Sequence, residues 1–125
     1  MAADFAPIFD SLKTVFLKHK KQLVVKADTP VQYTLLTKVA SPFPQHKGQP
    51  MWFGEVRIGK AYVSLHLLPL YMNPLLQKKV SPALKKRMQG KACFNFKTVP
   101  EAELIADLKQ LMDASVEVWR EKKWI

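Results

Sequence analysis

The chain has 125 residues, the length of one domain and enough to bury a core without disulfides or bound metal. Apolar residues make up 48% of it and charged residues 24%, which excludes disorder, collagen and a coiled coil as descriptions of the whole chain. The net charge of +10 favours anionic partners such as nucleic acid, lipid heads or phosphorylated metabolites, although such a charge can also serve solubility alone.

Several classes of site have no matching pattern in this sequence. The single cysteine, Cys93, excludes an internal disulfide and every metal motif built from several cysteines. The glycines lie too far apart for a phosphate-binding loop, and no metalloprotease or EF-hand spacing occurs. The start of the chain lacks the basic residues of a signal peptide, and the longest apolar stretch, residues 61–76, is too short and too polar to span a bilayer. We therefore expect a cytoplasmic protein with no cofactor, no metal and no membrane partner.

The first half of the chain predicts a helix followed by strands. Apolar residues at helical spacing predict a helix over residues 5–18, with Asp4 as its N-cap. Two β-rich segments, residues 22–27 and 32–39, flank a turn signal and predict antiparallel strands. The basic run that ends the helix complements the helix dipole, and His19 within it is expected to be exposed.

Residues 51–71 predict a β-hairpin. Gly59 and Lys60 fit a two-residue type II′ turn, which would pair Ile58 with Ala61. In that register one face is wholly apolar, includes Trp52, and should carry the helices. The other face mixes polar and aromatic side chains: Phe53, Glu55, Arg57, Tyr62, Ser64 and His66.

The second half predicts short helices, a strand and a long helix. Capping residues followed by proline predict helices over residues 74–79 and 82–88, the second ended by Gly90. Residues 92–97 predict a strand that places Cys93, Asn95 and Lys97 on one side. A capping box from Thr98 to Glu101 predicts a last helix that runs to residue 121.

This order of elements predicts one α+β domain over residues 1–125. We expect an antiparallel sheet of about five strands, with the N- and C-terminal helices packed on one face.

Two segments carry a family resemblance. GEVRIGKAYVSLHLLPLYMNPLL at residues 54–76 and SPALKKRMQGKACFNFK at residues 81–97, followed by a long terminal helix, resemble the bacterial YdhG-like family (domain of unknown function 1801). The resemblance spans most of the chain and implies a compact α+β domain with an antiparallel sheet. It also implies a distant link to frataxin-like iron chaperones. Iron delivery of that kind uses surface carboxylates, so the net charge of +10 and only ten carboxylates disfavour that role here.

The mixed face of the hairpin is the main candidate site. Arg57 suits a carboxylate or phosphate, and a few polar groups on an apolar surface are typical of ligand sites. We expect a non-catalytic binding module for a small anionic ligand. Its candidate residues are Phe53, Glu55, Arg57, Tyr62, Ser64, His66 and Asn95. Two other interpretations stay open: an ordinary exposed face with a surface ion pair between Arg57 and Glu55, and a homodimer interface.

Nucleic-acid or polyanion binding is the alternative function. It would use a basic segment composed of Lys78, Lys79, Lys85, Lys86, Arg87 and Lys91. An enzyme is the third hypothesis, because His66 could act as a base toward Ser64 or Tyr62, but the spacing supplies no complete chain of nucleophile, base and orienting group. Cys93 is expected to be a small buried hydrophobic residue of a strand.

Overall fold

The fold is built on a six-stranded antiparallel sheet with the strand order β1-β2-β3-β4-β6-β5. A computed structural model describes residues 5–40 and 43–125, so the expected cap Asp4 lies outside the described residues. The strands are β1 (Leu23–Asp28), β2 (Gln32–Ala40), β3 (Pro50–Ile58), β4 (Val63–Leu67), β5 (Met88–Gln89) and β6 (Cys93–Phe96). The predicted α+β class and antiparallel sheet are confirmed.

Helices flank the sheet and connect its strands. They are α1 (Ala6–Leu17), α2 (Leu68–Met72), α3 (Pro74–Gln77), α4 (Pro82–Lys85) and α5 (Ala102–Glu121), with short 3-10 helices at Lys20–Gln22 and Pro44–His46. Among the described residues, no helix combines the length and apolarity needed to cross a membrane.

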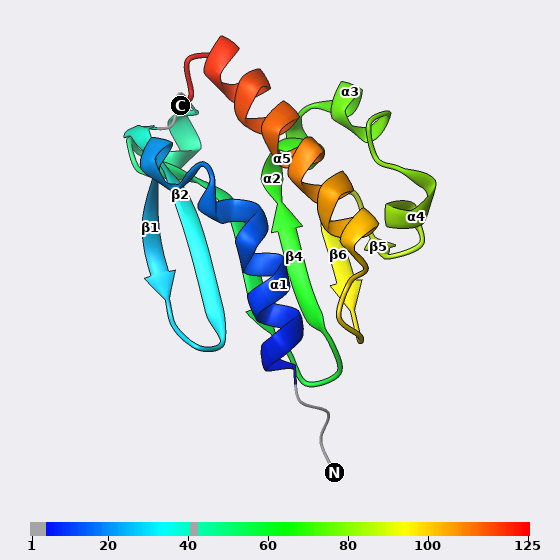
Figure 1. Ribbon diagram of the computed structural model, residues 1–125. Coiled ribbons are helices and arrows are strands. Elements are labelled where there is room, and N and C mark those ends of the chain that lie inside the picture. Colours follow the sequence, from blue (N-terminus) through cyan, green and yellow to red (C-terminus); the bar gives the residue numbers. More distant parts are fainter. Residues whose placement is uncertain (1–4, 41–42) are drawn as a thin grey trace.

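Both long helices, α1 and α5, lie on the same face of the sheet (Figure 1). Their apolar stripes bury Leu12 and Phe16 of α1 and Leu108 and Trp119 of α5. In β4 and β6, every second residue is buried on the side that faces these helices. The expected placement of the terminal helices is confirmed, and we call the opposite side of the sheet the open face.

The β3–β4 hairpin has a longer loop than expected. Ile58 pairs with Val63 rather than with Ala61, and the Gly59 N–H donates to the Tyr62 carbonyl oxygen at 2.9 Å. The predicted two-residue turn is therefore wrong, and the register is displaced by two residues. Because side chains alternate with a period of two, this displacement keeps Glu55, Arg57, Ser64 and His66 on the face expected for them.

A β-bulge in β3 reverses two of the expected placements. Leu35 of β2 pairs with Gly54 and Leu36 pairs with Trp52, so Phe53 is the additional residue of the bulge. The bulge turns the Phe53 side chain into the core, where it is fully buried and contacts Trp119 edge-on at 5.1 Å between ring centroids. It places Trp52 on the open face instead. The expected positions of Trp52 and Phe53 were both wrong.

The ends of several elements also differ from the predictions. The expected cap Ser81 accepts a hydrogen bond from the Leu84 N–H at 3.2 Å, as a helix N-cap does. The helix it starts ends at Lys85, and after a turn at Lys86 and Arg87 the chain forms the short strand β5. Gly90, at a φ of 77°, therefore turns the chain between β5 and β6. Glu101 is the N-cap of α5 without a side-chain hydrogen bond, so the predicted capping box is wrong.

Candidate functional site

Two rows of polar side chains cross the open face from strand to strand. The first, which we call the glutamate row, follows the pairs Thr34–Glu55, Glu55–His66 and His66–Cys93 across β2, β3, β4 and β6. The second, which we call the arginine row, follows the pairs Gln32–Arg57, Arg57–Ser64 and Ser64–Asn95 across the same strands. Paired residues of neighbouring strands lie on one side of a sheet, so each row is a continuous band.

The Glu55 carboxylate is held by neutral donors of β2. Gln32 Nε2 donates to Glu55 Oε1 at 2.5 Å, and Thr34 Oγ1 donates to the same oxygen at 3.2 Å. No group of the described residues donates a hydrogen bond to the second carboxylate oxygen, Oε2. Glu55 is half-buried, so these two donors fix its position on the face.

Arg57 is exposed on the same face. Within residues 5–40 and 43–125, its guanidinium forms neither an ion pair nor a hydrogen bond, although Glu55 lies two residues away on the same side of β3. The surface ion pair between Arg57 and Glu55, one of the interpretations that the sequence left open, is absent from this part of the chain.

Four side chains of β4 and β6 form a polar network beside Arg57. Ser64 Oγ donates to Asn95 Oδ1 at 3.0 Å, and Cys93 Sγ donates to the same oxygen at 3.3 Å. His66 Nε2 lies 3.7 Å from Cys93 Sγ. Asn95 is held in turn by a hydrogen bond from its Nδ2 to Gln89 Oε1 at 2.7 Å.

The thiol and imidazole in this network are both neutral near pH 7. Burial lowers the pKa of His66, the Glu55 carboxylate opposes that shift, and the Arg57 guanidinium adds to it. Burial raises the pKa of Cys93, against a hydrogen bond with Ser64. A cysteine nucleophile is activated by a lowered pKa, so this pair does not have the electrostatics of a thiolate–imidazolium catalyst.

An apolar hollow adjoins the open face at Trp52. The hollow has a volume of about 320 Å³ and is lined by Gln49, Pro50, Trp52 and Leu68. The half-buried indole of Trp52 also faces His66, with 5.8 Å between ring centroids. The open face thus combines an aromatic surface at one end of β3 with charged groups further along it.

Most of the candidate ligand-binding residues lie together on the open face. Glu55, Arg57, Ser64, His66 and Asn95 share the two rows, whereas Phe53 is in the core and Tyr62 lies in the loop before β4. Four other participants were not expected there from the sequence: Gln32, Thr34, Trp52 and Cys93. Cys93 is half-buried with polar contacts, so its expected role as a buried hydrophobic residue was wrong. Thr34 could have been found, because it is a polar residue between apolar residues of a predicted strand. No pattern in the sequence indicates that β6 lies beside β4.

The basic segment is divided by the fold. Lys86 and Arg87 line a groove of about 370 Å³ whose other residues include Glu101, Glu103 and Asp107. The Arg87 guanidinium also lies over the Phe96 ring, 5.9 Å from its centroid. Lys78, Lys79, Lys85 and Lys91 are exposed. The six cations of the segment therefore do not form one uninterrupted basic surface.

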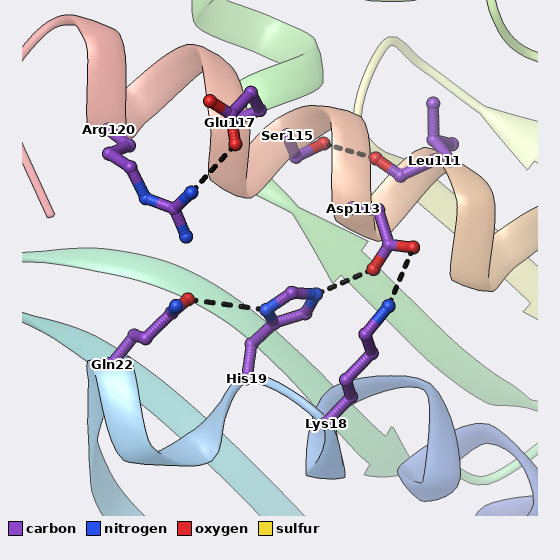
Figure 2. Close-up of polar contacts among 8 residues, drawn as sticks. All are labelled: Lys18, His19, Gln22, Leu111, Asp113, Ser115, Glu117 and Arg120. Carbon is purple, nitrogen blue, oxygen red and sulfur yellow. Dashed lines mark hydrogen bonds and ion pairs between the residues drawn. The ribbon is translucent and has the colours of Figure 1, made fainter.

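A separate polar cluster joins the end of α1 to α5 (Figure 2). Asp113 accepts from His19 Nε2 at 2.6 Å and from Lys18 Nζ at 3.1 Å, and His19 Nδ1 also contacts Gln22 Oε1 at 3.3 Å. The His19 side chain is only 12% exposed, so its expected exposure was wrong. Each side chain of this cluster contacts at least one other member, which is typical of a structural link.

The part of the chain that the structure describes contains no group of three or more His, Cys, Asp or Glu side chains placed to hold a metal ion. No protein-family model matches the chain. No curated protein and no solved structure matches it either. We therefore infer function from the geometry of the open face.

Proposed function

We propose that this chain is a non-catalytic binding module that holds a small anionic ligand on the open face through Arg57. The observation that carries the proposal is the distribution of charges on that face. Glu55 is bound by Gln32 and Thr34, while Arg57 has no acidic partner among the described residues. A guanidinium presents five N–H donors in a planar fork that suits carboxylate and phosphate groups.

The neighbours of Arg57 support an anion rather than a cation. Ser64 and Asn95 continue the arginine row with a hydroxyl and an amide, and the chain carries a net charge of +10. Burial lowers the pKa of His66 and keeps its imidazole neutral, so His66 can offer the anion a hydrogen bond but no positive charge.

Titration with inorganic phosphate and with citrate, followed by amide NMR, tests this proposal. We expect saturable shifts concentrated on β3, β4 and β6, and we expect them to disappear in Arg57→Ala. The double variant Lys85→Ala/Lys86→Ala is the matched control, because it removes positive charge away from the open face and should keep the response. Equal shifts in wild type and Arg57→Ala would contradict the proposal.

Polyanion binding through the basic segment stays a proposal with less support, since Lys86 and Arg87 share their groove with three carboxylates. It predicts a steep decrease of oligonucleotide affinity with salt that Lys85→Ala/Lys86→Ala makes shallower. An enzyme would require turnover that His66→Ala abolishes, and the neutral Cys93–His66 pair supports that proposal least.

We also propose that the chain belongs to the YdhG-like family and acts in the cytoplasm. The two quoted segments support the family, and the α+β fold agrees with what the resemblance implies. Solving the structure of an established family member would test this: its sheet should have the order β1-β2-β3-β4-β6-β5, with the counterpart of α5 on the same face as α1.

A further inference from the structure

We propose that the ligand of the open face is a nucleoside phosphate that lies along β3, with its base on Trp52, its sugar hydroxyls at Glu55 and its phosphate on Arg57. This inference rests on the anion-binding function proposed above and names the ligand class. Three chemically different groups follow one another on the same side of one strand, in the order base, sugar and phosphate.

The base end of the site is formed by Trp52. The bulge at Phe53 turns the indole onto the open face, where it is half-buried and borders the hollow of about 320 Å³. The other lining residues of this hollow, Gln49, Pro50 and Leu68, supply apolar surface and one side-chain amide. A planar heterocycle can stack on an indole, and every nucleobase offers the aromatic face that such stacking needs.

The middle of the site is formed by Glu55. Its Oε1 accepts both hydrogen bonds from β2. Among the described residues no group donates to Oε2, so this oxygen is available to a donor of the ligand. Sugar hydroxyls are such donors, and a carboxylate that hydrogen-bonds a ribose is a recurrent element of nucleotide sites. A bare phosphate, in contrast, would be repelled by Glu55 and gains only from Arg57.

The spacing of the three residues fits the length of a mononucleotide. With one residue taken up by the bulge, Trp52 and Arg57 are separated by about four strand steps, or roughly 13 Å at about 3.3 Å per residue. A nucleoside monophosphate is about eleven bonds long from the edge of its base to a phosphate oxygen, roughly 12 Å when extended. One mononucleotide can therefore reach both ends, with its sugar beside Glu55.

Binding of adenosine 5′-monophosphate, adenosine and inorganic phosphate, each measured by NMR titration, tests the assignment. The indole N–H signal of Trp52, identified in Trp52→Phe, should shift with the nucleotide and not with phosphate. We expect the monophosphate to bind more tightly than either fragment. Trp52→Ala should weaken nucleotide binding about tenfold and leave phosphate binding unchanged, because stacking on an aromatic side chain is lost.

Matched variants separate recognition from loss of structure. Trp52→Phe keeps an aromatic face and should retain most of the affinity, and Glu55→Gln keeps the shape of the side chain while weakening its acceptor. If phosphate binds through Arg57 but the nucleotide binds no more tightly, the nucleotide assignment is wrong and anion binding stands. If neither probe binds, both proposals fail.

The same chemistry can come from a free nucleotide or from the end of an oligonucleotide. A tetranucleotide that binds no more tightly than the monophosphate would assign the site to the free molecule. A tetranucleotide that binds much more tightly, and loses this gain in both Trp52→Ala and Arg57→Ala, would assign the site to a single strand. Binding of the tetranucleotide that neither variant changes would overturn the proposal.

Discussion

His19 and Asp113 are 94 positions apart in the chain, yet His19 Nε2 lies 2.6 Å from Asp113 Oδ1 (Figure 2). Lys18 contacts the other oxygen of the same carboxylate at 3.1 Å. Burial alone would raise the pKa of Asp113, but hydrogen bonds from His19 and Lys18 outweigh it and lower that pKa. The end of α1 is thereby tied to the middle of α5 by a charged carboxylate.

We expect the contribution of this link to the free energy of unfolding to be lost in acid. A carboxyl group whose pKa is lower in the folded than in the unfolded state stabilises the fold above its ordinary pKa, and this contribution disappears as the pH falls through the lowered value. We expect Asp113→Asn to reduce the free energy of unfolding at pH 7 by about 1 kcal/mol or less, because Asp113 is 44% exposed and screened by solvent.

Urea denaturation at pH 7 and in steps below about pH 4 measures this effect. The difference between wild type and Asp113→Asn should shrink as the pH falls. Glu117→Gln is a matched control, since within residues 5–40 and 43–125 its carboxylate pairs only with exposed Arg120 on the same helix, at 2.8 Å. A difference between wild type and Asp113→Asn that is constant over the whole pH range would show that the charge of Asp113 is not its cause.

Gly54 lies where α1 crosses β3, and the space there is too small for a larger side chain. A Cβ atom added there would lie 2.9 Å from the His66 carbonyl oxygen and 3.1 Å from the Phe16 ring. Because one of these neighbours is backbone, the strand itself must shift. We expect Gly54→Ala to destabilise the protein by about 1 to 3 kcal/mol in urea denaturation, as overpacking of a core does. A variant as stable as wild type would mean that β3 and β4 move apart freely.

The faces of the hairpin could be predicted from sequence because they depend only on alternation. The loop has two more residues than the predicted turn, and a displacement of two residues changes every pairing partner but no face. The bulge is different, because one additional residue exchanges the faces of everything that precedes it. Phe53 and Trp52 are both large aromatic residues, so their chemistry did not show which of them belongs in the core.

The candidate site could be predicted in part for the same reason. The polar residues of β3 and β4 were found because they alternate with buried residues on strands joined by a local turn. The contacts of His66 with Cys93 and of Ser64 with Asn95 depend on β6 lying beside β4, and their separations of 27 and 31 residues leave no local signal.

The environment of Cys93 predicts that its thiol is alkylated slowly. Burial raises the pKa of this group, so the thiolate fraction at pH 7 is below that of a free cysteine. We expect alkylation by iodoacetamide to be slower in the native than in the urea-unfolded protein, and its rate to keep rising above the pH where free cysteine levels off. Native Cys93 reacting faster than the unfolded chain at pH 7 would show that His66 activates it.

Among the aromatic residues of α5 and the C-terminal end, we expect the substitution of Trp119 to cause the largest loss of stability. Its ring is fully buried between Phe53 and Trp124, with ring-centroid distances of 5.1 and 5.4 Å, and its indole N–H has no hydrogen-bond partner among the described residues. Trp119→Ala should cost about 3 to 5 kcal/mol of unfolding free energy, through lost burial and a cavity. Half-buried Trp124 is the comparison, and Trp124→Ala should cost clearly less.

Trp119→Phe separates the ring from its polar atom. Phenylalanine keeps most of the apolar surface and removes a buried donor whose desolvation is not repaid by a hydrogen bond. The loss in urea denaturation should therefore be well below that of Trp119→Ala. If the two variants lose equal stability, the indole N–H has a partner in solution, and the packing of α5 on β3 depends on that hydrogen bond as well as on apolar contact.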